Sequence, residues 1–343
     1  MTGILVATLT VMPNKKFLHE AKNAKKDEFY TQLSDIEREL KNYKEHFKWK
    51  TVLCNCDDPR VSNFFHYFAY NFEQLGLKRL ITTCYKNQNP NLFTLNESEK
   101  AVYLIYDWDK NWNHVPDVEE IWVHNFKWDG DFRSEECVEL LKQADIVVTN
   151  PPFSLFREYV AQLMEYDKKF LIIWNINCIS YKEIFPLIRD NKIWLWTWMG
   201  RRISWFIVPN SYWLYWTEAG INDNWQRIVS TNNCLWLTNL DHHKRHEELI
   251  LYCRYNPDEY PKYDNYDAIN IDKTSNIPCD YDWIMWVPIT FLDKYNPDQF
   301  EILDINPHFF SMVEQWLQKP KQLTLKNVWQ KDPYARILIR RKK

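Results

Sequence analysis

The first part of the chain alternates between short apolar runs and longer segments in which apolar residues recur at helical spacing. The short runs predict strands, at residues 51–56, 79–84, 102–106, 145–149 and 170–176. The longer segments predict helices, at residues 34–47, 61–75, 135–144, 155–166 and 182–189. Such alternation is typical of βαβ units. We therefore expect an α/β fold with a doubly wound, mostly parallel, Rossmann-like sheet.

The pattern changes near residue 199, where short strands begin to alternate with long stretches rich in aromatic residues, asparagine and aspartate. This change predicts a first domain at 28–199 and a second, less regular region at 200–343. Residues 1–27 are predicted to be an N-terminal extension, in which Met12 is an alternative start.

The cellular compartment follows from what the chain lacks. No apolar run approaches the roughly 20 residues that span a bilayer, so a membrane protein is not expected. The apolar segment 3–11 has no basic residues before it and no small-residue cleavage site after it, so it is a poor signal peptide. The 8 cysteines form no CxxC pair, which disfavours structural zinc and disulfides. We expect a cytoplasmic protein without a metal site.

The net charge of −3 does not by itself indicate nucleic-acid binding. Local basic clusters can still contact phosphates, because patches of charge and not the total make such contacts. Each cluster alone is more often a solvated face. The candidate phosphate contacts are Arg201, Arg202, Lys244, Arg245 and Arg340.

Glycine is unusually scarce and tryptophan unusually abundant. The chain has 5 glycines and 18 tryptophans, whereas average usage predicts roughly 24 glycines. Several tryptophans, such as Trp128, Trp283 and Trp286, stand where a turn would favour glycine. One hypothesis is that UGA codons meaning glycine were translated as tryptophan; the alternative is a genuinely tryptophan-rich protein.

The segment Asn150-Pro151-Pro152-Phe153 directly follows a predicted buried strand. The Asn150 side-chain oxygen and the Pro151 carbonyl can accept hydrogen bonds from the two N–H groups of a planar amine. Such acceptors draw the nitrogen toward tetrahedral geometry, so that its lone pair can attack a methyl group. Phe153 can stack on the ring that carries the amine. The alternative is a turn that happens to contain two prolines.

Two further segments suit a cofactor. Asp131-Phe132 offers a carboxylate for an adenine amino group and an aromatic ring beside it, although Asp131 also suits a helix N-cap. The segment 54–59 occupies the place of a cofactor-binding turn but contains no glycine, so a pyrophosphate cradle is not expected. Asp57 or Asp58 can meet the ammonium or ribose of S-adenosylmethionine, or either can be a turn residue.

Five motifs resemble the EcoRI-type adenine-specific DNA methyltransferases, and the resemblance spans residues 14–340. They are Phe29-Tyr30-Thr31, Asn55 to Pro59, Gly130 to Ser134, Asn150 to Phe153, and Val287 to Asn296. The resemblance implies transfer of a methyl group from S-adenosylmethionine to N6 of an adenine flipped out of double-stranded DNA. It also implies a target-recognition region from about residue 200, which bends the DNA. Where the family pattern has glycine, this chain has Trp128, Trp283 and Trp286.

The resemblance also assigns roles to the site residues. Asn150 to Phe153 would hold the target base and Asp131 the cofactor adenine. The remaining residues predicted to bind the cofactor are Phe29, Tyr30, Thr31, Asn55, Asp57, Asp58 and Phe132. We expect a monomer that acts on double-stranded DNA, either alone or paired with a cognate restriction endonuclease.

Two alternatives stay open. The same catalytic domain can act on RNA or on a protein glutamine, because both present a planar amine. An inactive DNA-binding module is the other possibility. The segment 287–296 and the size of the C-terminal region favour DNA, and the intact segment 150–153 argues against an inactive protein.

Overall fold

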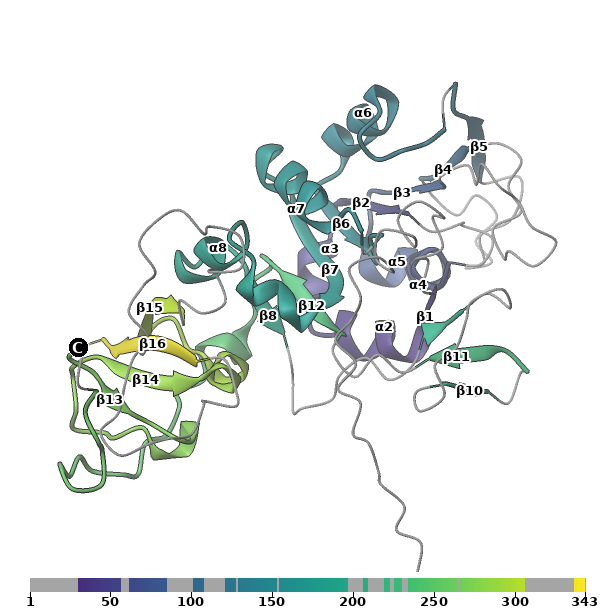
Figure 1. Ribbon diagram of the computed structural model, residues 1–343. Coiled ribbons are helices and arrows are strands. Elements are labelled where there is room, and N and C mark those ends of the chain that lie inside the picture. The colour runs from purple at the N-terminus through teal and green to yellow at the C-terminus, as the bar shows by residue number, and fades with distance from the viewer. Residues whose placement is uncertain are drawn as a thin grey trace, which may run out of the picture.

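The computed structural model, shown in Figure 1, describes most of the chain. The described residues are 30–56, 62–84, 101–107, 121–127, 129–152, 154–196, 206–208, 219–222, 225–229, 234–263, 266–305 and 336–342. No helix among these residues is both long enough and apolar enough to cross a membrane.

The largest sheet has eight strands in the order β5-β4-β3-β2-β6-β7-β12-β8. Their bounds are β2 (Thr51–Asn55), β3 (Arg79–Cys84), β4 (Val102–Tyr106), β5 (Trp122–Asn125), β6 (Ile146–Thr149), β7 (Lys169–Asn175), β8 (Trp194–Trp196) and β12 (Cys234–Thr238). The strand segments predicted from the sequence are therefore confirmed.

The prediction of a mostly parallel sheet is wrong. Parallel pairing joins only the central strands β3, β2, β6 and β7. The outer strands β4, β5, β12 and β8 pair antiparallel with their neighbours. Apolar runs reveal buried strands but not their direction, which is why the sequence missed the antiparallel edges.

Helices cover both faces of this sheet (Figure 1). They are α2 (Leu33–Leu40), α3 (Lys44–Phe47), α4 (Asn63–Tyr70), α5 (Phe72–Leu75), α6 (Glu135–Gln143), α7 (Phe156–Glu165) and α8 (Phe185–Arg189), with a short 3-10 helix η1 (Ile176–Ser180). Neighbouring residues of β2 show the division: Leu53 packs in the cluster with α6 and α7, and Val52 in the cluster with α2 and α4. Since strand side chains alternate between faces, an unbroken apolar strand needs cover on both.

Two smaller sheets flank this body. One has the order β1-β9-β11-β10, with β1 (Tyr30–Thr31), β9 (Phe206–Ile207), β10 (Ala219–Ile221) and β11 (Arg227–Val229). The other has the order β13-β14-β16-β15, with β13 (Ile269–Asn270), β14 (Met285–Pro288), β15 (Phe300–Ile305) and β16 (Arg336–Arg341). The 3-10 helices η3 (His243–His246), η4 (Thr274–Asn276) and η5 (Ile289–Lys294) lie in the same C-terminal part.

The sheets do not divide at residue 200. β12 lies inside the largest sheet between β7 and β8, and β9 pairs with β1 near the start of the chain. In Figure 1 the sheet β13–β16 lies to one side, next to α8 and β8. Among the described strands, those from β13 onward are the ones that form a sheet without the first part of the chain.

Two tryptophans adopt the left-handed backbone conformation that favours glycine. Trp49 has φ 60° and Trp225 has φ 59°, and their side chains are 73% and 87% exposed. Trp225 lies in the turn between β10 and β11, where its amide donates to the Asn222 carbonyl at 3.0 Å. Left-handed hairpin positions of this kind are usually occupied by glycine. These two positions are what the glycine-recoding hypothesis predicts.

The tryptophans that the sequence pattern placed at glycine-like turns make side-chain contacts where the structure describes them. Trp286 is 1% exposed and packs against Tyr263 with ring centroids 6.2 Å apart. The Trp283 indole donates a hydrogen bond to Asp267 at 2.9 Å. Both side chains therefore have contacts that glycine could not make, and Trp128 lies outside the described residues.

Trp225→Gly is expected to raise the free energy of unfolding by about 1 kcal/mol, because a left-handed residue with a side chain is strained by about that amount. Urea unfolding measures the change. Trp122→Gly is the control, since Trp122 is also exposed but lies in the ordinary strand β5, where glycine is unfavourable. A loss of stability at Trp225 equal to that at Trp122 would contradict the strain.

His246 connects the large sheet to the C-terminal sheet. The His246 imidazole lies 2.9 Å from Asp241, just after β12, and 2.5 Å from Asp298, just before β15. The hydrogen bonds to Asp298 and Asp241 raise the pKa of His246 above its ordinary value. The protonated ring therefore joins the C-terminal sheet to the large sheet.

This bridge makes stability depend on pH. A raised pKa means that the contribution is fully present below the unfolded histidine pKa of about 6.5. It is lost as pH rises through the higher folded pKa. We expect the difference in Tm between wild type and His246→Gln to be largest near pH 6 and to shrink toward pH 9. The exposed neighbour His243→Gln is the control, and a difference that grows with pH would contradict the bridge.

Candidate active site

Two asparagines lie together at the carboxyl edge of the large sheet. β2 ends at Asn55, and β6 ends at Thr149, directly before Asn150. The two strands are parallel neighbours, so the chain leaves both at the same edge. The Thr149 hydroxyl donates to the backbone carbonyl of Asn55. Asn55 and Asn150 are 7% and 6% exposed, so both amides at this edge are buried.

The segment 129–133 reaches the same edge through a glycine. Gly130 has φ 74°, and a Cβ at this position would lie 2.7 Å from the carbonyl oxygen of Cys84, the last residue of β3. Only glycine permits both the backbone conformation and this close approach. Because β3 is the parallel neighbour of β2, Gly130 places the segment with Asp131 and Phe132 at the same sheet edge as Asn55.

The Asp131 carboxylate is held in one orientation by Arg133. The Arg133 guanidinium donates to both carboxylate oxygens, at 2.9 and 2.7 Å, and to Glu158 of α7 at 2.8 Å. Its hydrogen bond with Asp131 is the main reason that the pKa of Arg133 is raised above its ordinary value. The N-cap of α6 is Ser134, whose hydroxyl accepts from the Cys137 amide at 3.3 Å. The alternative role of Asp131 as the helix N-cap is therefore excluded.

The two prolines join β6 to α7. Pro151 is buried, and the Pro152 carbonyl accepts from the Leu155 amide at 3.0 Å. Since proline has no N–H, this loop presents mostly acceptors at the edge of the sheet. Phe153 lies outside the described residues.

The described part of the N-terminal motif forms β1 and contacts the start of α4. The Thr31 carbonyl accepts from the Asn63 side chain at 2.7 Å, and Asn63 begins α4, soon after the segment that follows β2. Tyr30 and Thr31 are buried, at 4% and 2% exposure. The predicted residues Phe29, Asp57 and Asp58 lie outside the described residues.

The structure adds a site residue that the sequence did not indicate. Tyr159 of α7 donates its hydroxyl to the Asn55 side-chain oxygen and packs its ring edge-on against Phe132. In the sequence Tyr159 belongs to an apolar helix stripe with Phe156, Val160 and Leu163. That pattern is typical of a core residue, and only the partner of its hydroxyl reveals the connection.

The predicted phosphate contacts are scattered. Arg245 is 8% exposed, stacks on Trp194 at 3.6 Å and donates to Asn191, so its prediction as a surface contact for DNA is contradicted. The sequence could not reveal this burial, because Arg245 stands among other basic residues. Arg340 forms an ion pair with Glu301 on the neighbouring strand. Arg201 and Arg202 lie outside the described residues.

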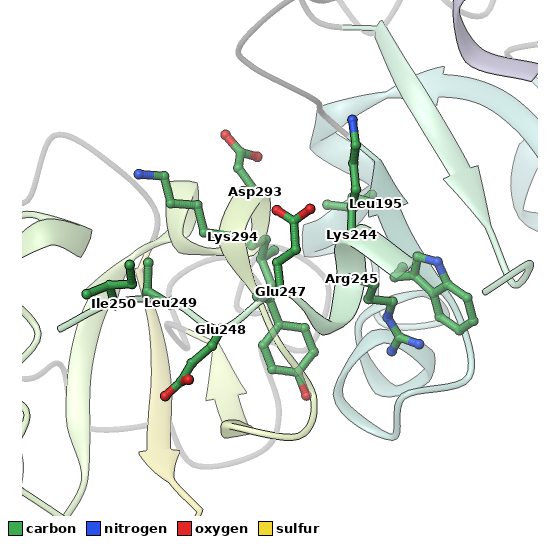
Figure 2. Close-up of a pocket in the computed structure, with 12 residues that line it drawn as sticks. Leu195, Lys244, Arg245, Glu247, Glu248, Leu249, Ile250, Asp293 and Lys294 are labelled. Carbon is green, nitrogen blue, oxygen red and sulfur yellow. The ribbon is translucent and has the colours of Figure 1, made fainter. Parts of the chain in front are cut away.

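A cavity of about 400 Å³ lies where the C-terminal part meets β8 (Figure 2). Its walls include Lys244, Glu247, Asp293 and Lys294, and thus carry charges of both signs. β8 is separated from β6 by β7 and β12, so this cavity is distinct from the edge that holds Asn150. Within the described ranges, no group of three His, Cys, Asp or Glu side chains is placed to hold a metal ion.

The chain is similar to known methyltransferases over nearly its full length. The model of the family described as adenine-specific methyltransferase EcoRI matches residues 17–342. The type II methyltransferase M.EcoRI of Escherichia coli is 55% identical over 330 residues, covering 96% of this chain and 97% of the relative. M.MpnI of Mycoplasma pneumoniae is 34% identical, covering 95% and 98%. M.MgeORF184P of Mycoplasma genitalium is 37% identical, covering 94% and 98%. No solved structure matches the chain significantly.

Gly130→Ala is expected to reduce the free energy of unfolding by about 3 kcal/mol, because the new Cβ adds a clash with Cys84 to the backbone strain. Gly76→Ala is the matched control. Gly76 is also left-handed, with φ 61°, but its nearest neighbour is a flexible lysine side chain at 3.6 Å. It should cost about 1 kcal/mol. Equal losses in urea unfolding would show that the close approach at Gly130 is unimportant.

Proposed function

The chain belongs to the family of the adenine-specific methyltransferase EcoRI and is a site-specific adenine DNA methyltransferase, and we propose that it transfers a methyl group from S-adenosylmethionine to N6 of an adenine flipped out of the duplex. The observation that carries this proposal is the placement of Asn150 and Pro151 at the carboxyl end of β6, at the same sheet edge as Asn55 at the end of β2 and the segment 129–133 near the end of β3. Ligands of open α/β sheets bind at this edge. The central parallel strands, covered by helices on both faces, support describing the sheet as Rossmann-like.

The residues present fit S-adenosylmethionine. The Asp131 carboxylate is oriented by Arg133 and suits the adenine amino group as a hydrogen-bond acceptor. Asn55 offers an amide nearby, and the glycine-free segment after it suits a cofactor that has no phosphate. Phe132, Tyr30 and Thr31, together with Phe29, Asp57 and Asp58, complete the proposed cofactor-binding set. When bound, the cofactor supplies an electrophilic methyl group on a sulfonium.

The proposed mechanism rests on Asn150 and Pro151. The exocyclic amine of adenine is a weak nucleophile, because its lone pair is delocalised into the ring. The Asn150 side-chain oxygen and the Pro151 carbonyl accept hydrogen bonds from its two N–H groups and thereby favour tetrahedral geometry at the nitrogen. Asn150 is 6% exposed, so these acceptors act with little competition from water. Phe153 stacks on the flipped base, and Pro152 helps to keep the loop rigid.

We propose that the C-terminal part recognises the DNA target. The segment 287–296 that distinguishes this family in sequence begins in β14 and continues through η5. The sheet of β13 to β16 forms no strand pairs with the large sheet among the described residues. This favours a recognition region that begins after β12 and not at residue 200. Lys244, Arg340, Arg201 and Arg202 remain proposed phosphate contacts. We also propose a cytoplasmic monomer, and the type II names of the relatives support a cognate restriction endonuclease as its partner.

The decisive experiment offers labelled S-adenosylmethionine with duplex DNA, RNA or total protein. We expect label on N6 of adenine in DNA at one sequence context. Label in RNA or on glutamine would replace DNA as the substrate. Duplex binding without any transfer would indicate an inactive DNA-binding protein.

Asn150→Ala is expected to reduce methyl transfer at least about 100-fold, because it removes an acceptor that acts on the reacting nitrogen. Its affinity for S-adenosylmethionine should stay within about twofold of wild type. Asp131→Ala should instead lower the affinity for S-adenosylmethionine about tenfold, because a charged hydrogen-bond acceptor is lost. Calorimetric titration and transfer rates measure both. Equal losses of cofactor affinity in the two variants would show that the roles are misassigned.

A further inference from the structure

Tyr159 stands between the two segments proposed to bind the cofactor. Its side chain is fully buried at 0% exposure. The hydroxyl donates to the Asn55 side-chain oxygen, across 104 residues of sequence. The ring packs edge-on against Phe132, with centroids 5.1 Å apart and planes at 73°. One side chain therefore contacts both Asn55, at the end of β2, and Phe132, in the segment that follows Gly130.

Its neighbours on α7 hold the same segment. Glu158 accepts from Arg133 at 2.8 Å, and Gln162 donates to the Phe132 carbonyl at 3.1 Å. These contacts hold the two residues that follow Asp131, and the Asp131 carboxylate itself accepts hydrogen bonds from Arg133. α7 begins at Phe156, shortly after the segment 150–153, so the same helix follows the proposed target-base loop and contacts the proposed cofactor residues.

The hydrogen bond of Tyr159 sets the direction of the Asn55 amide. Burial raises the pKa of the Tyr159 phenol well above its ordinary value, so the hydroxyl keeps its proton. An amide whose oxygen accepts from a fixed phenol must turn its NH2 group, which is a donor, the other way. The Asn55 backbone is fixed as well, because its carbonyl accepts from Thr149 of β6. Tyr159 thus controls the part of Asn55 that strand pairing leaves free to rotate.

We propose that Tyr159 is a positioning residue for the cofactor: it orients the Asn55 amide and supports Phe132, and thereby couples cofactor binding to the helix that follows the target-base loop. The inference rests on the proposed function, because it assumes that Asn55 and Phe132 face S-adenosylmethionine. Tyr159 itself acts through Asn55 and Phe132 and not on the reacting atoms.

The test is Tyr159→Phe, which removes the hydroxyl but keeps the ring against Phe132. Calorimetric titration of the full chain with S-adenosylmethionine should give a Kd raised about 3- to 10-fold, as expected for one lost hydrogen bond that acts on binding. The KM for the cofactor should rise by the same factor, while kcat at saturating cofactor stays within about twofold.

The chain offers a matched control in Tyr263→Phe. Tyr263 is also buried, and its hydroxyl donates to the side-chain oxygen of Asn270 at 2.7 Å, but this pair lies with the C-terminal sheet. Removal of either hydroxyl should lower Tm by a similar amount, whereas only Tyr159→Phe should weaken cofactor binding. This comparison separates positioning from general destabilisation.

A double-mutant cycle completes the test. If Tyr159 acts through Asn55, then adding Tyr159→Phe to Asn55→Ala should weaken cofactor binding by less than the two separate effects predict. Unchanged affinity in Tyr159→Phe, or equal loss in Tyr159→Phe and Tyr263→Phe, overturns the inference while leaving the proposed function intact. Wild-type protein that binds no S-adenosylmethionine overturns both.

Discussion

In the centre of the large sheet, β2 and β6 run parallel as neighbours, so the chain leaves both strands at the same edge. Asn55 and Asn150 come together for this reason, and the hydroxyl of Thr149 fastens the two strand ends. The pairing depends in turn on apolar residues that are buried on both faces, such as Val52 and Leu53. The site is thus a consequence of burying a strand between two layers of helices.

The segment 129–133 depends on this edge but is not part of the sheet. It is held by a glycine that closely approaches the end of β3, by hydrogen bonds within the segment, and by side chains of α7. A carboxylate and an amide are thereby presented together in fixed orientations, which suits recognition of a small polar cofactor.

Much of the fold could be predicted from the sequence, because the central strands are apolar runs separated by clear helical periods. The antiparallel strand β12 could not, since it lies among short strands of the C-terminal part that resemble it in pattern. The candidate site was visible where residue type itself carries the chemistry, as in Asn150 and Asp131. Tyr159 was not singled out, and Arg245 was taken for a surface residue, because burial and the partner of a polar group are properties of the folded chain. The low glycine count could not show which tryptophans occupy positions that favour glycine, whereas the left-handed backbone at Trp225 identifies one such position.

We propose that the carboxyl edge of β2, β3 and β6 binds the cofactor. Hydrogen exchange of the full chain with and without S-adenosylmethionine tests it most directly. We expect slower exchange at residues 54–56, 129–133 and 149–160, and no change in the C-terminal strands at 269–270 and 300–305. Protection confined to the cavity around residues 244–250, with none at the carboxyl edge, would contradict the account.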